Sequence, residues 1–516
     1  MRPLEIIVVG GGIAGMAYAV RLAELSGGGR AHVRVLAKSS VRGSSSYAAQ
    51  GGIAAAIGDG DTVDQHAQDT IMVGCGRNNR AVVNRVVSEA PGIIGWLQGL
   101  GARFDSDAHG RLSLAREGGH STARVAHHLD RTGEEVVRAL RERLKGAEGI
   151  ELIEGQRVID LCMAEDAGGQ RVTGVRCIDT MSGDLLEFHA DAVVLATGGI
   201  GQVYERTTNP AEATGDGIAM AIRAGAQVRD MAFVQFHPTA LYTRAQGQSP
   251  LISEAVRGAG AKLLRPDGRP LMAGAHPAGD LAPRNVVARA IQLEMLRSGT
   301  SHVLLDASPI GAVRFAKEFP AIERICRKEH LSPGRDALPV APAAHYLCGG
   351  IATDATGRTS LPGLYALGEC ACTGLHGADR LASNSLLEAL VIPRHAAEAT
   401  LRDERPRALR ETQRIAGSKL SFRAPVPAQR ETEALRHAMS AHAGIIRERI
   451  GLEIALRTIA HGERVIHPML QRRRWSMALL DLRDLLTVAR AITEAALVEP
   501  VSVGTHYLEA RQPLIP

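Results

Sequence analysis

The segment that most constrains the fold of this chain is an apolar run that leads into a glycine-rich turn. Residues 6–9 read Ile-Ile-Val-Val, which is typical of a strand buried on both faces. Gly10, Gly12 and Gly15 follow at dinucleotide-binding spacing, and a helical pattern begins directly after them. In such a turn the three glycines permit the turn itself, the approach of a pyrophosphate, and close packing of helix on strand. The helix N-terminus adds N–H groups and a positive dipole, so the segment predicts a dinucleotide site.

Composition places the chain among ordinary globular proteins. Its 516 residues are enough for two or three domains, and 45% of them are hydrophobic and 22% charged. The net charge of +5 is small for this length and indicates no nucleic-acid partner. The apolar run over 6–20 is too short and glycine-rich to span a membrane, and no cleavage site of a signal peptide follows it. We therefore expect no membrane association by the chain itself.

The cysteines indicate the redox environment. Seven are scattered along the chain without any C-x-x-C pair: Cys75, Cys162, Cys177, Cys326, Cys348, Cys370 and Cys372. An odd number at irregular spacing favours reduced thiols and hence a cytoplasmic protein. Cys370 and Cys372 lie two residues apart, but no second pair accompanies them, so we expect no metal site there.

Two further apolar runs end in glycine turns and indicate how the chain is divided. Residues 191–200 and 363–370 each read as a buried strand followed by small residues. Three strand ends spread this widely predict one sheet that is interrupted by an insertion. The insertion is expected to run from about residue 231 to 345.

Helical patterns complete the coarse prediction. After residue 417 the sequence becomes helical and rich in Arg, with the clearest helices expected at 434–450 and 475–495. The Pro-containing stretch 423–429 is the expected linker. Earlier in the chain, a short helix with Trp96 buried is expected at 92–101, and Thr132 is expected to cap another helix.

Three polar residues follow strands or turns where a nucleotide would lie. Lys38 ends the second predicted strand, where an NAD-binding unit usually has an acidic residue. It is either a contact to an adenosine ribose or phosphate, or a solvated lysine. Asp216 begins a helical pattern and is either its N-terminal cap or a ribose ligand. Glu369 is placed to accept hydrogen bonds from ribitol or ribose hydroxyls.

A series of motifs resembles the succinate dehydrogenase/fumarate reductase flavoprotein superfamily, and within it the L-aspartate oxidases most closely. In chain order they are GGGIAG, SYAAQGGIAA, REGGHS, ATGGIG, TGDG, QFHPTAL, DLAPRNVVARAI, HYLCGGI, LGEC and LHGADRLASNSLLEALV. The resemblance covers nearly the whole chain and implies an α/β fold in three parts. These are a Rossmann-like FAD-binding domain (1–230 and 346–416), an inserted α+β capping domain (231–345) and a C-terminal helical domain (417–516).

The same resemblance implies which residues hold FAD. They are Gly10, Gly12, Ile13, Ala14, Gly15, Lys38, Ser45, Ser46, Tyr47, Ala48, Ala49, Gln50, Gly51, Gly52, Asp216, Glu369, Ser385 and Leu386. In succinate dehydrogenases a His of the SYAAQGG region attaches FAD covalently. Ser45 stands at the matching position here and cannot form that bond, so FAD is expected to be noncovalent.

The residues that match the substrate site are cations, N–H donors or hydroxyls. A dicarboxylate needs such groups at both ends, and Arg supplies a planar bidentate fork. The matching residues are His237, Ser253, Arg284, His345 and Arg380. Considered one at a time, each would more often be structural, and it is the resemblance that implies their role in substrate binding.

Arg284 matches a residue that transfers a proton beside the scissile C–H bond in the superfamily. The pKa of an arginine exceeds about 12, so it acts as a base only in a dry, charge-dense site with a proton relay. Glu254 and Arg257 resemble that relay. Ala259 stands where the family often has a Glu, so one carboxylate of the family's pattern is missing.

Glu117 and Cys348 separate the oxidase from its dicarboxylate relatives. Glu117 puts an anion where the α-ammonium of an amino acid would pair, whereas the dehydrogenase relatives usually carry a neutral residue. Cys348 stands where the succinate and fumarate enzymes usually have Met. The resemblance implies hydride transfer from L-aspartate to FAD, which yields iminoaspartate. O2, giving H2O2, or fumarate is the expected electron acceptor, and quinolinate synthase, in de novo NAD biosynthesis, takes the imine.

Two alternatives remain beside this interpretation. The first alternative is the flavoprotein subunit of a succinate dehydrogenase or fumarate reductase. The second comes from a non-redox class and is an FAD-binding scaffold or an RNA-modifying protein. Departures from the family's motifs at 74–79 and 501–506 indicate altered domain packing or a shifted substrate. At 501–506 the family's Glu and Arg are missing, while His506 is retained.

Overall fold

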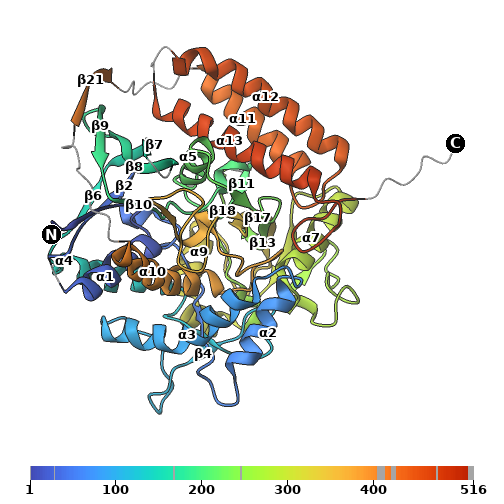
Figure 1. Cartoon of the computed structure of the whole chain (residues 1–516). Helices are drawn as coiled ribbons and strands as arrows, with labels where there is room; N and C mark the ends of the chain where they lie inside the picture. Colours follow the sequence, from blue (N-terminus) through green and yellow to red (C-terminus); the bar gives the residue numbers. More distant parts are fainter. Residues whose placement is uncertain are drawn as a thin grey trace.

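The centre of the molecule is a five-stranded parallel sheet in the order β19-β10-β1-β2-β6. The computed structural model describes residues 2–27, 29–166, 169–243, 247–403, 413–419, 426–471 and 475–509. The strands of the sheet are β1 (Leu4–Val9), β2 (Ala31–Ala37), β6 (Ile150–Glu154), β10 (Ala192–Leu195) and β19 (Leu364–Ala366). The three predicted apolar runs thus lie next to one another, which confirms that one sheet is assembled from distant segments (Figure 1).

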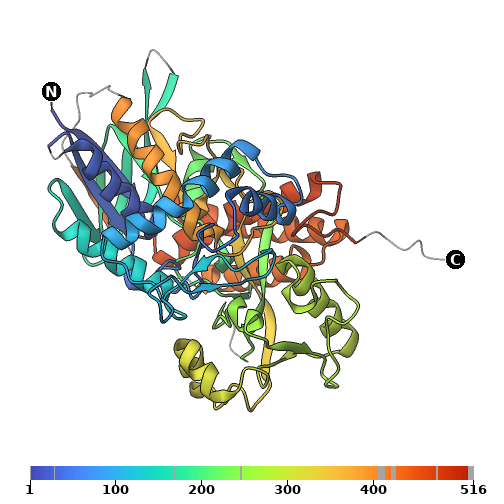
Figure 2. The same cartoon turned by 90° about the horizontal axis from the view of Figure 1, so that it is seen from below.

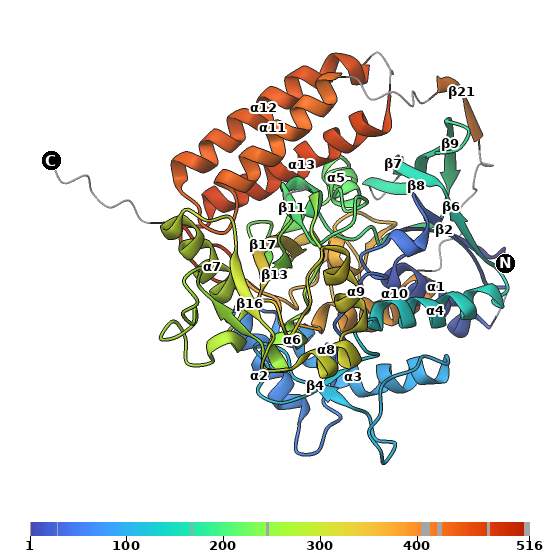
Figure 3. The same ribbon diagram turned by 180° about the vertical axis from the view of Figure 1, so that it is seen from behind.

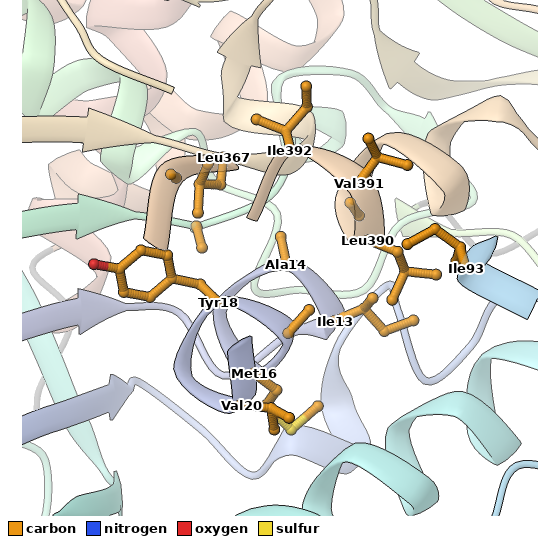
Figure 4. Close-up of a cluster of buried hydrophobic side chains, with 14 of the residues drawn as sticks. Ile13, Ala14, Met16, Tyr18, Val20, Ile93, Leu367, Leu390, Val391 and Ile392 are labelled. Carbon is orange, nitrogen blue, oxygen red and sulfur yellow. The ribbon is translucent and has the colours of Figure 1, made fainter. Parts of the chain in front are cut away.

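Successive side chains of β1 enter two different cores, because neighbours in a strand point to opposite faces. Ile6 and Val8 belong to a core on one face of the sheet, and Ile7 and Val9 belong to a core on the other face. All four are buried, which is why β1 needs β-branched residues on both faces. Figure 4 shows part of the first core, where Ile13 lies near Leu390 and Met16 lies beside Val20.

The first face is covered by helices whose buried residues share the core of Ile6 and Val8. They are α1 (Ile13–Ser26), α3 (Arg80–Gly99), α4 (Thr132–Lys145) and α10 (Asn384–Arg402). The short helix expected at 92–101 is the second half of the longer α3, so its start and the full burial of Trp96 were predicted wrongly. The helix begins at Arg80, capped by Asn79, and Trp96 is half-buried with the Arg21 guanidinium 3.6 Å from its ring centroid. Thr132 is the first residue of α4, not its cap, and its hydroxyl accepts from the His128 N–H.

The second face packs against an antiparallel sheet and a bundle of C-terminal helices. The sheet consists of β21 (Gln413–Lys419), β9 (Asp184–His189), β8 (Gly169–Asp179) and β7 (Gln156–Asp166), in that order. The helices are α11 (Val426–His442), α12 (Arg449–Gln471) and α13 (Met477–Val498), which lie side by side in Figures 1 and 3. Together with α5 (Asp216–Arg223) they supply the core that contains Ile7 and Val9.

The boundaries of the C-terminal helices correct two predictions. The expected helix at 434–450 is in fact the end of α11, a connection, and the start of α12, because the helix stops at His442 and the next begins at Arg449. The expected helix at 475–495 corresponds to α13, which Ser476 caps. The expected linker at 423–429 lies partly outside the described residues, and its second half from Val426 is helical.

The segment between β12 (Val228–Arg229) and β18 (Gly350–Ala352) forms a lobe with a hydrophobic core of its own (Figure 2). We call this the cap lobe; its core residues run from Leu241 to Val340. Its sheet has the order β14-β11-β17-β16-β15, with β13 paired to β17. The elements are β13 (Val234–Leu241), β14 (Gly247–Gln248), α6 (Glu254–Gly258), β15 (Lys262–Leu264), α7 (Arg284–Ser298), β16 (Val303–Asp306), α8 (Ala312–Glu318), α9 (Pro320–Lys328) and β17 (Leu338–Leu347). Since β11 (Arg206–Thr207) also joins this sheet, the division of the chain at residue 231 stays a prediction.

Shorter elements connect these parts. They are β3 (Ile53–Ala54), α2 (Val63–Val73), β4 (Leu114–Ala115), β5 (Val125–Ala126), β12 (Val228–Arg229), β18 (Gly350–Ala352) and β20 (Ala371–Cys372). Within the part of the chain that the structure describes, no helix combines the length and the apolar character required to cross a membrane.

Candidate active site

A single continuous cavity joins the glycine turn after β1 to the arginines of the cap lobe. It starts where the parallel strands β1, β2 and β10 end, the edge at which open α/β sheets bind their ligands. Residues from both the nucleotide-binding sheet and the cap lobe line it. The predicted residues in its wall are Gly10, Gly12, Ile13, Ala14, Lys38, Ser45, Ser46, Ala48, Ala49, Gln50, Gly51, Gly52, Glu117, His237, Ser253, Glu254, Arg284, His345, Glu369, Arg380, Ser385 and Leu386.

Four predicted residues are not part of that wall. The Tyr47 hydroxyl instead donates to Glu134 at 2.9 Å, and Arg257 reaches the cavity only through Glu254. Gly15 has a packing role, because a Cβ there would lie 2.1 Å from the Gly10 carbonyl oxygen. Asp216 contacts the wall through Lys38 and is the first residue of α5, whose cap is Gly215.

The glycine turn leaves the N-terminus of α1 open to a ligand. Gly10 has φ +117°, and a Cβ on it would lie 2.1 Å from the Ala196 carbonyl oxygen, so only glycine fits there. Gly12 caps α1, and the first turn contains no acidic side chain. The Ile13 N–H donates to the Ser46 hydroxyl at 3.1 Å, which holds the serine loop against the helix end. This geometry suits a pyrophosphate.

Lys38 and Asp216 form an ion pair at the far end of the cavity. The Lys38 ammonium lies 2.8 Å from the Asp216 carboxylate and 3.1 Å from the Thr214 hydroxyl. Burial acts to raise the pKa of Asp216, but Lys38 and Arg157 outweigh it and keep that pKa below its ordinary value. The wall therefore presents an oriented cation rather than the acidic residue of an NAD-binding unit, and Lys38 is not simply solvated.

Glu369 follows the end of β19 and lies close to the backbone at Leu347 and at Gly199. Its carboxylate accepts from the Leu347 N–H at 3.1 Å, and a Cβ on Gly199 would lie 2.1 Å from it. Burial raises the pKa of Glu369 to about 7, with the Leu347 N–H acting in the opposite direction. A hydroxyl-rich ligand in the cavity would offset the desolvation of the ionised carboxylate by donating hydrogen bonds to it.

The strand pair β13–β17 brings the two predicted histidines together. His237 pairs with Ala343 in the antiparallel register, close to His345, and the two ring centroids are 5.0 Å apart. Burial, followed by the nearby arginines, lowers the pKa of both histidines well below 6.5, so both rings are neutral. The Thr239 N–H donates to Nδ1 of His237 at 3.2 Å, which leaves its proton on Nε2 as a hydrogen-bond donor.

Gln235 links the two predicted substrate arginines, and sequence reasoning missed it. Its Oε1 accepts from Arg284 at 3.1 Å and from Arg380 at 3.0 Å. Its Nε2 donates to Asp379 at 2.6 Å and to the Arg380 carbonyl oxygen at 2.8 Å. Gln235 and Asp379 both stand inside the motifs of the resemblance, but an uncharged amide and an Asp next to an Arg give no signal of their own.

Arg284, Glu254 and Arg257, the residues predicted to form a relay, are joined by hydrogen bonds. Arg284 Nε donates to one Glu254 oxygen at 2.7 Å, and Arg257 donates to the other at 2.8 Å. Burial acts to raise the pKa of Glu254, but the two arginines outweigh it and hold that pKa at about 2. Arg257 donates onward to the Asp280 carbonyl oxygen. The chain of hydrogen bonds from Arg284 thus ends at a backbone oxygen of the cap lobe, which fixes the Arg257 guanidinium.

Glu117 lies in the same cavity, on a loop that also carries Gly118. It is 3% exposed, and the Ser383 hydroxyl donates to its carboxylate at 2.6 Å. A Cβ on Gly118 would lie 2.2 Å from Glu254, so glycine lets this loop approach the relay. Burial, and then the charge of Glu254, raise the pKa of Glu117 above its ordinary value. A cationic ligand group beside Glu117 would stabilise its charge.

The two neighbouring cysteines have separate surroundings. The Cys370 thiol faces the Leu195 carbonyl oxygen at 3.3 Å, and the Cys372 thiol faces Asp230 at 3.3 Å. Within the described ranges, no group of three or more His, Cys, Asp or Glu residues is arranged to hold a metal ion.

Comparisons with known proteins agree with this geometry. A family model described as an FAD binding domain matches residues 5–386. L-aspartate oxidase 1 of Ralstonia nicotianae is 41% identical over 98% of this chain and 94% of its own length. L-aspartate oxidase of Yersinia pestis is 39% identical over 98% of this chain and 95% of its own. The chain belongs to the L-aspartate oxidase family.

Members of this family are FAD-dependent oxidoreductases, and the cavity of this chain fits FAD. The glycine turn, the open end of α1 and the oriented Lys38 lie along one continuous wall. The fold is shared more widely. The FrdA chain of a mutant quinol fumarate reductase from E. coli superposes with a TM-score of 0.87 at 27% identity, over 100% of this chain and 94% of that one. The expected α/β fold with a helical C-terminal region is therefore confirmed.

Proposed function

We propose that this chain oxidises L-aspartate to iminoaspartate, with O2 or fumarate as the final electron acceptor. The observation that carries the proposal is the position of Glu117 in the same cavity as Arg284 and Arg380. The two arginines supply charge for two carboxylates, and Glu117 supplies the opposite charge for an ammonium group. L-aspartate carries those three groups, whereas succinate lacks the ammonium.

The substrate site binds by complementary charge and by neutral donors. Arg380 keeps its proton at neutral pH, because burial and Arg284 lower its pKa only to about 10. The neutral His237 offers its Nε2–H, and the Ser253 hydroxyl lies in the same wall. The Ser253 oxygen also accepts from the Ala255 N–H at 3.3 Å, which fixes its position at the start of α6.

Oxidation removes a hydride equivalent from Cα and a proton from the substrate nitrogen. FAD, when bound, supplies the two-electron acceptor for this step. Glu117 is the group placed to receive the ammonium proton, because its raised pKa makes its carboxylate a better base than an exposed Glu.

Fumarate reduction needs a proton delivered to carbon, and Arg284 is the donor that we propose. Glu254 and Arg257 return a proton to Arg284 along the hydrogen bonds that join them. Fumarate gains two electrons and two protons and becomes succinate. With O2 the same two electrons and two protons give H2O2.

The proposal extends to the setting of the reaction. We propose that the protein works in the cytoplasm, that its FAD is noncovalent because Ser45 replaces the attaching His, and that quinolinate synthase takes the imine as the next step toward NAD. In support, Cys75, Cys162, Cys177, Cys326, Cys348, Cys370 and Cys372 are free thiols.

The test is anaerobic bleaching of the flavin in the purified protein. L-aspartate in one cuvette should bleach the yellow colour, and succinate in a second cuvette should have little effect. Bleaching by succinate alone would support the alternative, a succinate dehydrogenase or fumarate reductase flavoprotein subunit. Bleaching by neither would contradict both, and release of the flavin by acid tests its noncovalent attachment separately.

A further inference from the structure

Asp379 is a buried carboxyl that the proposed mechanism does not use. It is fully shielded from solvent and lies one residue before Arg380. One of its oxygens accepts from the Gln235 amide at 2.6 Å and from the Arg380 N–H at 3.0 Å. The other accepts from the Asn285 N–H in the first turn of α7 at 3.4 Å. Asp379 therefore connects the two sides of the substrate site without lining the cavity itself.

The orientation of the Gln235 amide depends on Asp379. An amide presents either its oxygen or its NH2 group, and only the oxygen can accept from the two arginines. Because Nε2 donates to Asp379 and to the Arg380 carbonyl oxygen, Oε1 must face Arg284 and Arg380. Two guanidinium groups, which repel each other, are thus held on one oxygen atom.

The charge of Asp379 reaches the same arginines. Among the groups that face Asp379, the charged ones are Arg284 of α7 and Arg380. The others are the Gln235 amide of β13, the Asn285 N–H of α7, and the thiols of Cys75 and Cys348. In this low-dielectric setting one negative charge offsets part of the positive potential that a dicarboxylate would feel.

We propose that Asp379 is a positioning residue whose carboxylate, acting through Gln235, moderates the charge of Arg284 and Arg380 and weakens dicarboxylate binding when it is ionised. This inference rests on the proposed function, because it assumes that the arginines bind a dicarboxylate. Burial raises the pKa of Asp379 to about 6, with Gln235 and Arg284 opposing it. The affinity for a dianion should therefore rise as the pH falls through that range.

The direction of this pH dependence follows from the coupling between ligand binding and the protonation of Asp379. Above pH 6 Asp379 is charged, and its negative charge offsets part of the positive potential that Arg284 and Arg380 present to the ligand. Below pH 6 Asp379 is neutral, this offset is lost, and binding tightens. Because an ionised ligand favours protonation of its anionic neighbour, the binding of a dianion should also take up a proton near this pH.

The test measures fumarate binding to the oxidised holoenzyme from pH 5.5 to 8.5. Fumarate is the probe because it keeps both carboxylates ionised over this range and cannot reduce FAD. Perturbation of the flavin absorbance reports the Kd without turnover. The wild-type protein should bind fumarate about tenfold more tightly at pH 5.5 than at pH 8.5.

Asp379→Asn removes the charge and retains an oxygen that accepts from Gln235. We expect it to bind fumarate about three- to tenfold more tightly than the wild type at pH 8.5, with the ratio falling toward one at pH 5.5. Asp379→Glu is the matched control that keeps the charge, and its pH dependence should resemble that of the wild type. Asp379→Ser replaces the Asn variant if that variant fails to load FAD.

The outcomes separate this inference from the proposed function. If the wild type and the Asn variant bind fumarate with the same Kd across the range, Asp379 does not moderate the arginines. If neither the wild type nor any variant binds fumarate at any pH, the assignment of this cavity as a dicarboxylate site is wrong, and both proposals are overturned. A tighter Kd in the Asn variant that is equal at both pH extremes would also contradict the role of its ionisation.

Discussion

At the scale of single residues, the site is built from charges whose neighbours decide what they can do. Glu254 and Glu117 are both buried acids in one cavity, yet their pKa values move in opposite directions. Glu254 lies between two guanidinium groups and stays ionised. Glu117 accepts from a neutral hydroxyl and feels the negative charge of Glu254. The first suits a relay, and the second suits a group that receives a proton.

The substitution Glu117→Gln should lower kcat/KM for L-aspartate by about 30- to 100-fold, because it removes the charged partner of the ammonium. Fumarate has no ammonium, so fumarate reduction should change less than about threefold. Both activities are measured on the same FAD-loaded preparation. Equal losses in the two assays would refute the ammonium role, and Glu117→Asp, which keeps the charge, should recover part of the aspartate activity.

The substitution Glu254→Gln should lower the free energy of unfolding by about 3 kcal/mol at pH 7, because it leaves Arg284 and Arg257 without their shared counter-charge. The pKa of Glu254 is held at about 2 in the folded protein, below its ordinary 4.5. Its contribution is present above pH 4.5 and is lost as the pH falls toward 2. The difference between wild type and variant should therefore be about 1 kcal/mol smaller at pH 4.

Urea unfolding at the two pH values checks this prediction, and a difference that is independent of pH would contradict it. Fumarate reduction should also fall in the Glu254→Gln variant. Glu294→Gln is the matched control, because Glu294 pairs with two arginines of the cap lobe and lies outside the cavity wall. Its fumarate reduction should stay close to that of the wild type.

At the scale of elements, the cap lobe is held over the cavity by a few directed contacts. The Asn285 side chain of α7 donates to the Gly504 carbonyl oxygen at 2.8 Å, near the departure at 501–506. On the opposite side, Asp130 from the loop before α4 accepts from the N–H groups of Ala321 and Ile322 at 2.8 Å each. Asp130 thus caps α9 of the cap lobe from outside that lobe. This contact ties the cap lobe to the nucleotide-binding sheet.

The substitution Asp130→Ala should cost about 1 kcal/mol, the usual effect of a lost helix cap, and should loosen the cap lobe. The expected signs are faster proteolysis within 231–345 and a higher KM for L-aspartate. Asp130→Asn keeps an accepting oxygen and should lie close to the wild type in both measurements. Proteolysis that is unchanged in the Ala variant would show that α9 does not depend on this contact.

At the scale of the whole molecule, the C-terminal helices are joined to the nucleotide-binding region by buried charge. Arg157 of β7 is 1% exposed and pairs with Asp481 and Asp484 of α13. Arg223 of α5 also reaches Asp484, at 2.8 Å. Ile7 and Val9 of the parallel sheet share a hydrophobic core with these helices. The buried ion pairs therefore lie between the C-terminal helices and the nucleotide-binding region.

The substitution Arg157→Met should lower the free energy of unfolding by about 2 kcal/mol, because Asp484 keeps Arg223 but loses one counter-charge. Flavin fluorescence during heating should show earlier release, while turnover at low temperature stays within twofold. Arg176→Met is the matched control on β8, where an exposed pair with Glu187 should contribute less than about 1 kcal/mol. Equal shifts in the two variants would mean that the buried network adds no stability.

Much of the fold and of the site could be predicted from local pattern. Three apolar runs with glycine turns predicted the parallel sheet, and the motifs around His237, Arg284 and Arg380 marked residues that the structure brings into one cavity. The helix end at 442 was missed, because the apolar period continues past Gly444 and the stop signal of that glycine was not used. Whether each residue plays its proposed role stays a prediction.

The sequence by itself determined the β-branched strand, the glycine spacing and the order of the motifs, because these depend on neighbours along the chain. Only the tertiary structure decided that Gln235 holds two arginines, that Asp379 orients it, and that Asp130 caps a helix some 190 residues away. The physical reason is that hydrogen bonds and pKa values depend on distance in space. An amide or a buried Asp acquires its task only from the groups that folding places beside it.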